Sequence, residues 1–342
     1  MRMTKLGKFT KFSKFFEETI WFFSTALTVD EMMVKFHGRT NLQQFMKNKP
    51  ERWGIKKWEI ASAEGYLFDC DIYCGKGSNI YSSKKKPVLT KCSLGSRVVL
   101  SMTQDLLLSI VPGKLDRYHL YFDNFFTNPD LLIHLKTRAL KATGTVRVNR
   151  VNAVNNLDKN AERGAHIVQY EKNSGLNFIT AMDSKAVSVL STAAGVTPLS
   201  DMDRFSFDEM KDIAVPFPHA FKMYNTFMGG VDSHDSHCSN LMPCIRAKRW
   251  TWPIFIRLIQ SSMANATVLR NYVHETRGSK ELAMKIAEHY LLKATVRQKH
   301  NEGIADLKRN CENYSKCSVR TQKICKDCNV HVCSACFKIL HQ

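Results

Sequence analysis

The 342-residue sequence contains no long uninterrupted apolar run. The longest candidate, residues 20–29, is about half as long as the ~18 residues of a membrane span, and Ser24 and Thr25 interrupt it. The N-terminal segment also lacks the apolar core and small-residue cleavage site of a secretory signal. Its basic residues are mostly lysine, unlike the arginines of a transit peptide. These absences predict a cytosolic or nuclear protein without a membrane partner.

Acidic residues are also scarce. There are 31 aspartates and glutamates against 50 lysines and arginines, which gives a formal net charge of +19. This excess indicates a polyanionic partner, with nucleic acid favoured over a membrane surface. A basic protein without such a partner is the alternative. The chain has no internal repeat or low-complexity tract, and a hydrophobic content of 44% is enough for the cores of two or three domains.

Cysteines are sparse over most of the chain, but six of the 11 fall in the last 32 residues. In a reducing compartment such a cluster indicates metal binding rather than disulfides. Cys325-x2-Cys328 and Cys333-x2-Cys336 have the spacing of paired thiolate ligands of tetrahedral zinc. With four further candidate ligands there are enough for two structural zinc ions in a cross-braced, RING- or PHD-like module: Cys311, Cys317, His331 and His341. Reduced cysteines without metal are the alternative.

A short apolar strand pattern ends on an acid, Asp123, within YHLYFDNFFT (118–127). Two aromatic residues follow, and Asn128-Pro129 then opens a predicted helix. A carboxylate among aromatic side chains is costly to bury unless it meets a cation or a metal. Two interpretations remain open: Asp123 caps a strand-to-helix turn, or it binds a metal.

The order of elements around this strand predicts an RNase H-like α/β core. Strands are predicted over 54–61 and 65–73 as an antiparallel hairpin, and over 88–90, 118–122 and 144–148, with helices over 96–111 and 129–137. In that fold the first and fourth strands lie side by side, and each can present an acid at the same edge. Further on, short strands and an acidic stretch indicate an insertion, and helical patterns cover 220–236, 252–272, 280–292 and 294–306.

Two further stretches carry recognisable chemistry. GGVDSHD (229–235) places an acid after a double glycine, and RAKRWTWP (246–253) is a basic and aromatic segment before an apolar helix. Within the first, His234 and His237 have the i, i+3 spacing of a helical metal site, with exposed polar residues as the alternative.

In this order, and with YFDNFFT, these stretches closely resemble the transposase domain of the piggyBac family. Other matching segments are VDEMMVKFHGRTNLQQFMKNKPERWGIKKW (29–58), EGYLFDCDIYCGKG (64–77), GTVRVNR (144–150) and DSKAVSVLST (183–192). The resemblance runs from about residue 27 to the C-terminus. Family members usually carry an acidic or disordered N-terminal region and more of a helical domain than this sequence shows.

The resemblance implies a cut-and-paste DNA transposase core in which three aspartates hold two divalent metal ions, with Mg²⁺ suited to such hard oxygen ligands. By motif, Asp123 is the second aspartate and Asp232 the third. The first is expected five residues before Tyr66, where the sequence has Ala61, which cannot bind metal. We therefore expect a piggyBac-derived DNA-binding protein with impaired catalysis, needing Mg²⁺ only if the site functions. The alternatives are an active transposase rescued by Glu64, Asp69 or Asp71, and a zinc-module interaction protein on an inert scaffold.

The resemblance also implies double-stranded DNA as a partner, a homodimer and a nuclear location. The residues expected at DNA are Arg147, Arg246, Lys248, Arg249 and Trp250. For Trp250 the alternative is packing at the start of the next helix, and for Arg147 it is a solvated position. The cysteine-rich module contributes to recognition of transposon-end DNA in the family. The family usually begins that module with a CxxC pair, whereas five residues separate Cys311 from Cys317 here.

The predicted domains follow from these matches. They are residues 1–54 and 242–306 as two parts of a helical dimerisation and DNA-binding domain, 55–150 and 216–241 as two parts of the RNase H-like core, 151–215 as the insertion, and 307–342 as the zinc module.

Overall fold

The computed structural model describes residues 25–47, 49, 51–75, 92–109, 114–153, 157–207, 209–241, 247–273, 278–295 and 301–340. The chain divides into two compact units, Met1–Lys280 and Glu281–Gln342, and each is described by itself. The strand predicted over 88–90 lies outside the described residues. Within the described part of the chain, no helix has the length and apolar character needed to cross a membrane.

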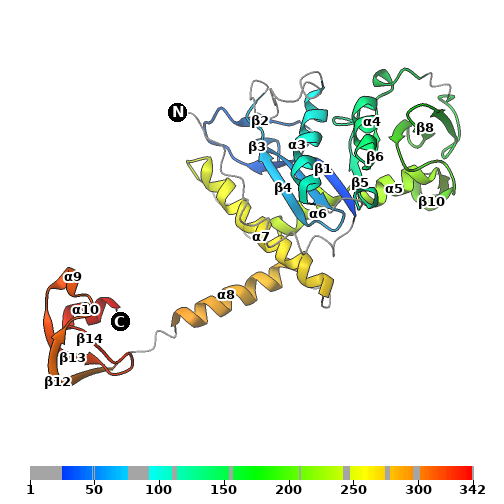
Figure 1. Cartoon of the computed structure of the whole chain (residues 1–342). Helices are drawn as coiled ribbons and strands as arrows, with labels where there is room; N and C mark the ends of the chain where they lie inside the picture. Colours follow the sequence, from blue (N-terminus) through cyan, green and yellow to red (C-terminus); the bar gives the residue numbers. More distant parts are fainter. Residues whose placement is uncertain are drawn as a thin grey trace. The chain divides into compact units, whose positions relative to one another are not determined.

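The first unit is built on a nine-stranded mixed sheet (Figure 1). Its order is β2 (Gln43–Phe45), β3 (Trp53–Ser62), β1 (Ala26–Lys35), β5 (His119–Phe122), β6 (Lys141–Thr145), β9 (Ala186–Ser191), β8 (Leu176–Met182) and β7 (His166–Glu171), with β4 (Leu67–Ile72) also paired to β3. The β3–β4 pair is antiparallel, which confirms the predicted hairpin. Strands β1, β5 and β6 run parallel, and β3 is antiparallel to β1, so the centre of the sheet is an RNase H-like core.

The strand that lies beside β5 is β1, and this corrects the sequence interpretation. The strand over 54–61 was expected to be the first of the core, whereas β3 is separated from β5 by β1. The sheet therefore begins before residue 55. The pattern of β1 was obscured because Asp30 and Glu31 interrupt an apolar run, ALTVDEMMVK, that is buried over most of its length.

Helices cover both faces of the central strands (Figure 1). On one face, Val29 and Phe122 pack with residues of α3 (Leu94–Ser109) and α4 (Pro129–Thr137). On the other, Ala61 packs with residues of α6 (Gly230–Ser239) and α7 (Thr251–Val273). Alternate residues of a strand point to opposite faces, so Thr28, Asp30 and Met32 share the α6–α7 face.

Only part of the predicted insertion joins the core sheet. Strands β7, β8 and β9 extend the core sheet through the antiparallel β6–β9 pair. The acidic stretch forms β10 (Ser200–Ser206), which pairs with β11 (Lys211–Phe217) as a two-stranded hairpin. The helix predicted over 220–236 is two helices, α5 (His219–Phe227) and α6, separated at Gly229.

The second unit contains most of a 17-residue helix, a small sheet and two short helices. They are α8 (Ser279–Thr295), β12 (Glu302–Asn310), α9 (Tyr314–Cys317), β13 (Arg320–Cys325), β14 (Val330–His331) and α10 (Ser334–Leu340). The prediction of a helix over 294–306 is wrong at its C-terminal end, where β12 pairs with β13. Sheet pairing around the cysteine-rich core overrides the helical spacing of this segment.

Candidate functional site

Asp30 and Asp123 occupy neighbouring positions on parallel strands. The register pairs Val29 of β1 with Phe122 of β5, so the next residue of each chain segment is an aspartate. Adjacent strands are about 4.8 Å apart. Both aspartates follow the alternation of Thr28 and Tyr121, and therefore face the side of the sheet covered by α5 and α6.

Burial and repulsion disfavour negative charge on both carboxyl groups. Burial raises the pKa of Asp30 to about 7, with further contributions from the charges of Glu31 and Asp123, against the opposing charge of Lys49. Burial also raises the pKa of Asp123, although the backbone N–H of Phe125 opposes this. A bound cation would offset both the burial of the carboxylates and their mutual repulsion, so the pair has the electrostatic character of a site for a hard divalent cation.

Two lysines lie near this pair and bind its neighbour Glu31. Lys49 Nζ is 3.8 Å from Glu31 Oε1, and Lys56 Nζ is 3.7 Å from Glu31 Oε2. The ammonium of Lys56 also lies 4.0 Å from the centre of the Trp58 ring, a cation–π contact. Burial lowers the pKa of Lys56. The site therefore combines acids with nearby basic groups.

The loop after Asp123 is fixed by backbone and arginine contacts. The N–H of Phe125 donates to Asp123 Oδ1 at 2.8 Å. Arg150 Nη1 donates to the carbonyl oxygens of Asn124, Phe125 (3.2 Å) and Thr127 (3.1 Å). The guanidinium of Arg150 thus holds the loop that positions Asp123.

Arg147, predicted to contact DNA, is exposed and directly precedes the short 3-10 turn Val148–Arg150. Its Nε donates to Asn124 Oδ1 at 3.2 Å.

Asp232 lies in the first turn of α6, on the helix that covers the same face, and is exposed. The start of this helix is pressed against the sheet: a Cβ at Gly230 would overlap the carbonyl oxygen of Ser62 and lie 3.0 Å from Thr28 Oγ1. The three aspartates do not form a group of ligand atoms within 4.8 Å of one another; in the described ranges only a set of cysteines does. The structure thus brings Asp30 and Asp123 together and places Asp232 on the overlying helix.

Ala61 does not occupy the position beside Asp123. It pairs with Thr28, two residues before Asp30, and is buried under α6. Counting back from Tyr66 therefore reaches a residue of β3, whereas the strand that pairs with β5 on this side is β1. The substitute acids considered for Ala61 are also displaced, since Asp69 and Asp71 lie on β4, which β3 and β1 separate from β5.

Asp30 was not among the candidate residues predicted from the sequence. The signal that could have found it is a carboxylate inside a ten-residue segment that is otherwise mostly apolar.

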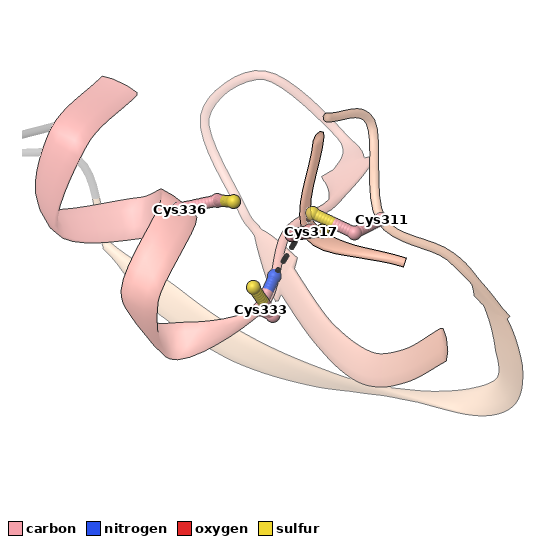
Figure 2. A group of neighbouring side chains, drawn as sticks. All are labelled: Cys311, Cys317, Cys333 and Cys336. Carbon is pink, nitrogen blue, oxygen red and sulfur yellow. Dashed lines mark hydrogen bonds between the residues drawn. The ribbon is translucent and has the colours of Figure 1, made fainter. Parts of the chain in front are cut away.

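Four cysteine sulfurs converge in the second unit (Figure 2). The Sγ atoms of Cys311, Cys317, Cys333 and Cys336 all lie within 4.8 Å of one another. Three of these residues are buried and Cys317 is half-buried. The N–H of Cys333 donates to Cys311 Sγ at 3.4 Å, and hydrogen bonding from the Cys336 backbone lowers the pKa of Cys333 to about 7.

The four-cysteine cluster pairs the first two cysteines of the module with the last two. Cys325 and Cys328, which lie between these two pairs in sequence, are not part of the cluster, an order compatible with the cross-braced module expected from the sequence. The irregular first pair still supplies two sulfurs because α9 makes one helical turn before Cys317.

The remaining predicted ligands are not part of this cluster. His331 Nε2 lies 2.9 Å from the carbonyl oxygen of Leu307, so this nitrogen donates to the backbone. Cys325 is buried and Cys328 is exposed. His341 lies outside the described residues. A second zinc site stays a prediction.

The predicted DNA-contacting segment before α7 is described in part. Lys248 and Arg249 are exposed, whereas Trp250 is half-buried and packs against the cluster that contains Val231 and Ile254. Arg246 lies outside the described residues.

The fold and these residues define a class of protein. It has an RNase H-like core with two aspartates at neighbouring positions of parallel central strands, and a unit whose four cysteines can hold a metal ion. A family model described as Transposase IS4 matches residues 3–267. Human "PiggyBac transposable element-derived protein 3" is 32% identical over 273 residues, which cover 78% of this chain and 44% of that protein. The chain belongs to the piggyBac transposase family.

Further comparisons agree with this family assignment. Human "PiggyBac transposable element-derived protein 2" is 27% identical over 240 residues, covering 69% of this chain and 39% of that protein. The chain thus spans less than half the length of these two relatives. A solved structure, a piggyBac transposase synaptic complex with hairpin DNA, superposes with a TM-score of 0.59 at 18% identity, covering 92% of this chain and 70% of that chain. At this identity the likeness shows the fold.

Proposed function

We propose that the first unit is a metal-dependent DNA strand-cleavage and strand-transfer core, in which Asp30, Asp123 and Asp232 hold the metal. The observation that carries the proposal is the position of Asp30 beside Asp123. An alanine at position 61 is then no obstacle, because Ala61 is not at the position where a first metal ligand is needed. This favours an active transposase core over the impaired derivative expected from the sequence.

In this proposal each residue has a separate task. Asp30 and Asp123 bind the cation, and Arg150 keeps the Asp123 loop in place through three backbone carbonyls. Asp232 completes the site from the first turn of α6. A bound pair of Mg²⁺ ions supplies activation of the attacking oxygen and stabilisation of the leaving oxygen. Lys49 and Lys56 offset part of the negative charge of the acids, and Glu31 keeps them near the site.

We further propose that the four cysteines of the second unit bind a structural zinc ion. Zinc–sulfur bonds of about 2.3 Å in a tetrahedron place the sulfurs about 3.8 Å apart, which is compatible with four Sγ atoms within 4.8 Å. Cys325, Cys328, His331 and His341 remain candidates for a second ion.

Double-stranded DNA is the proposed partner. The net charge of +19 supports it, as do the exposed Lys248 and Arg249 before α7, and the related solved structure carries hairpin DNA. A homodimer and a nuclear location belong to the same proposal.

The test is a strand-nicking assay on duplex DNA with TTAA-flanked transposon ends, the substrate that the family resemblance implies, in Mg²⁺ or Mn²⁺. Wild type is expected to cut, and Asp30→Asn and Asp123→Asn to abolish cutting while DNA binding persists. Asp71→Asn on β4 is the matched control and should keep activity. If wild type bound DNA in a salt-sensitive way but did not cut it, the protein would instead be the catalytically impaired derivative expected from the sequence. Absence of DNA binding even at low salt would leave the interaction-module alternative.

A further inference from the structure

A fully buried histidine, His234, joins α6 to two other parts of the first unit. It has no exposed surface. Its Nδ1 lies 2.9 Å from the carbonyl oxygen of Gly65, and its Nε2 lies 3.0 Å from Ser261 Oγ on α7. A carbonyl only accepts, so Nδ1 carries the proton and donates to Gly65, and Nε2 accepts from the Ser261 hydroxyl. Cys238 Sγ lies 3.4 Å from the same Nε2.

Both partners of His234 are themselves held in place. Gly65 has a φ of +91°, and a Cβ there would lie 2.9 Å from the backbone nitrogen of His234, so the β3–β4 turn fits closely against α6. On α7, Asn265 accepts from the N–H of Leu67 and donates to its carbonyl, both at 2.8 Å. The α7 helix is therefore anchored to β4, and Ser261 lies one helical turn before that anchor.

The rest of the buried face of α6 offers little apolar surface to set its orientation. Its other buried residues are Gly230, Val231 and Cys238. Apolar burial is non-directional, whereas polar contacts fix the rotation and height of a helix. The two His234 hydrogen bonds are the buried ones, and the half-exposed contact of 3.0 Å between Arg257 Nη1 and Asp235 Oδ1 adds to them. Each residue of an α-helix advances the side-chain direction by about 100°, so a small rotation of α6 would move the exposed Asp232 away from the Asp30–Asp123 edge.

We propose that His234, clamped between the Gly65 carbonyl and the Ser261 hydroxyl, is a positioning residue that fixes α6 so that Asp232 can reach a metal held by Asp30 and Asp123. The metal part of this inference rests on the proposed function, whereas the clamp on α6 does not.

The test compares Ser261→Ala, which removes the hydroxyl, with Ser261→Thr, which keeps it, and with Asn265→Ala, which weakens α7 anchoring without touching His234. His234→Asn is a second loss variant, because its amide can still donate to the Gly65 carbonyl but has no atom at the position of Nε2. Two quantities are measured on the full chain: amide hydrogen exchange of the first turn of α6, and Mn²⁺ affinity by electron paramagnetic resonance, with Asp123→Asn as the reference for loss of the site. A thermal melt of each variant accompanies both.

Ser261→Ala is expected to speed exchange in α6 and to weaken Mn²⁺ binding about 10-fold, the scale of losses when groups behind a metal ligand are removed. Ser261→Thr should keep most of the exchange protection and of the Mn²⁺ affinity. His234→Asn should lose both to a similar extent as Ser261→Ala, because it also lacks the bond between His234 Nε2 and Ser261 Oγ. Asn265→Ala, which leaves both His234 bonds in place, should weaken Mn²⁺ binding much less than Ser261→Ala at a similar melting temperature.

Unchanged exchange in Ser261→Ala would overturn the clamp whatever the metal does. Faster exchange with unchanged Mn²⁺ affinity would overturn the positioning role, as would an equal affinity loss in Asn265→Ala. If wild type and Asp123→Asn bind Mn²⁺ equally, or neither binds it, the proposed function fails. The hydrogen-exchange data then support or refute the clamp by themselves.

Discussion

The ion pair between Lys57 and Glu59 should be the most sensitive electrostatic contact in the first unit. Lys57 Nζ lies 2.8 Å from Glu59 Oε1, and the two side chains are only 1% and 0% exposed. Both belong to β3 and face α6 and α7. Desolvation opposes the charge of Lys57, but interactions with Cys70 and Glu59 hold its pKa above the usual range. The second oxygen of Glu59 has no hydrogen-bond partner among the residues that the structure describes.

These contacts predict a large cost for breaking the pair and a small cost for removing it. Lys57→Met leaves the Glu59 carboxylate buried and uncompensated, which should cost about 3–5 kcal/mol of unfolding free energy. Solvent does not screen this interaction, since the two side chains are almost fully buried. The double variant Lys57→Met/Glu59→Leu removes both charges and should lie within about 1–2 kcal/mol of wild type. The double variant should therefore be more stable than the single variant Lys57→Met, although additive losses would make it less stable.

The measurement is urea unfolding followed by tryptophan fluorescence, with Trp58 in the same strand as a reporter. The matched control is Lys35→Met, which breaks an ion pair of similar length, 2.7 Å, whose side chains are 41% and 43% exposed. Its cost should be at most about 1 kcal/mol. If Lys57→Met cost no more than Lys35→Met, or if the double variant were less stable than Lys57→Met, the reasoning about this buried pair would be refuted.

Three further outcomes follow from other contacts. Arg150→Ala removes the contacts to three loop carbonyls and should weaken Mn²⁺ binding about 10-fold or more. Arg147→Ala loses one exposed contact and should leave Mn²⁺ binding unchanged. Equal effects of the two variants would show that the loop does not need Arg150. Burial lowers the pKa of His119 to about 4, so the unfolded chain takes up a proton that the folded chain refuses as pH falls from about 6.5 to about 4. Unfolding free energy should fall by up to about 3 kcal/mol across that window, and His119→Asn should flatten this pH dependence in urea titrations. Zinc chelation should unfold the second unit while the first keeps its melting transition, and Cys311→Ser should reproduce this; a second unit that keeps its circular dichroism without metal would contradict a structural zinc.

Much of the central sheet was predictable because its strands carry clear alternation or apolar runs. The β3–β4 hairpin, α3, β5 and α4 all lie close to their predicted ranges. The pairing of β1 with β5 could not be predicted, because it depends on contacts between segments about 90 residues apart, which local sequence patterns do not reveal. Asp30 on β1 interrupted the pattern that would have marked a central strand. The fold class was therefore predicted correctly, whereas the residue examined as the first acid, Ala61, lies on β3 and not on the strand beside β5.

The cysteine site was predictable in composition but not in pairing. The CxxC spacing predicted Cys333 and Cys336 as a pair of candidate zinc ligands, and spacing alone could not say which distant pair would lie beside them. Cys311 and Cys317 do so because a one-turn helix and Ser318, at a φ of +52°, reverse the chain after an unusually long gap. A local backbone conformation of this kind leaves almost no trace in composition.

The face of the sheet under α6 and α7 differs in kind from the face under α3 and α4. The α3–α4 side is a continuous apolar cluster, whereas Lys57, Glu59, His234 and Ser261 are all buried on the other side. In the sequence these residues resemble a solvated surface, and His234 was expected to be exposed or to bind metal. Apolar faces tolerate small helix shifts, but a buried polar network loses its hydrogen bonds when a helix moves. The helix that carries Asp232 is therefore packed on the side of the sheet where buried polar contacts oppose its displacement, which the proposed metal site, assembled from a strand pair and a separate helix, requires.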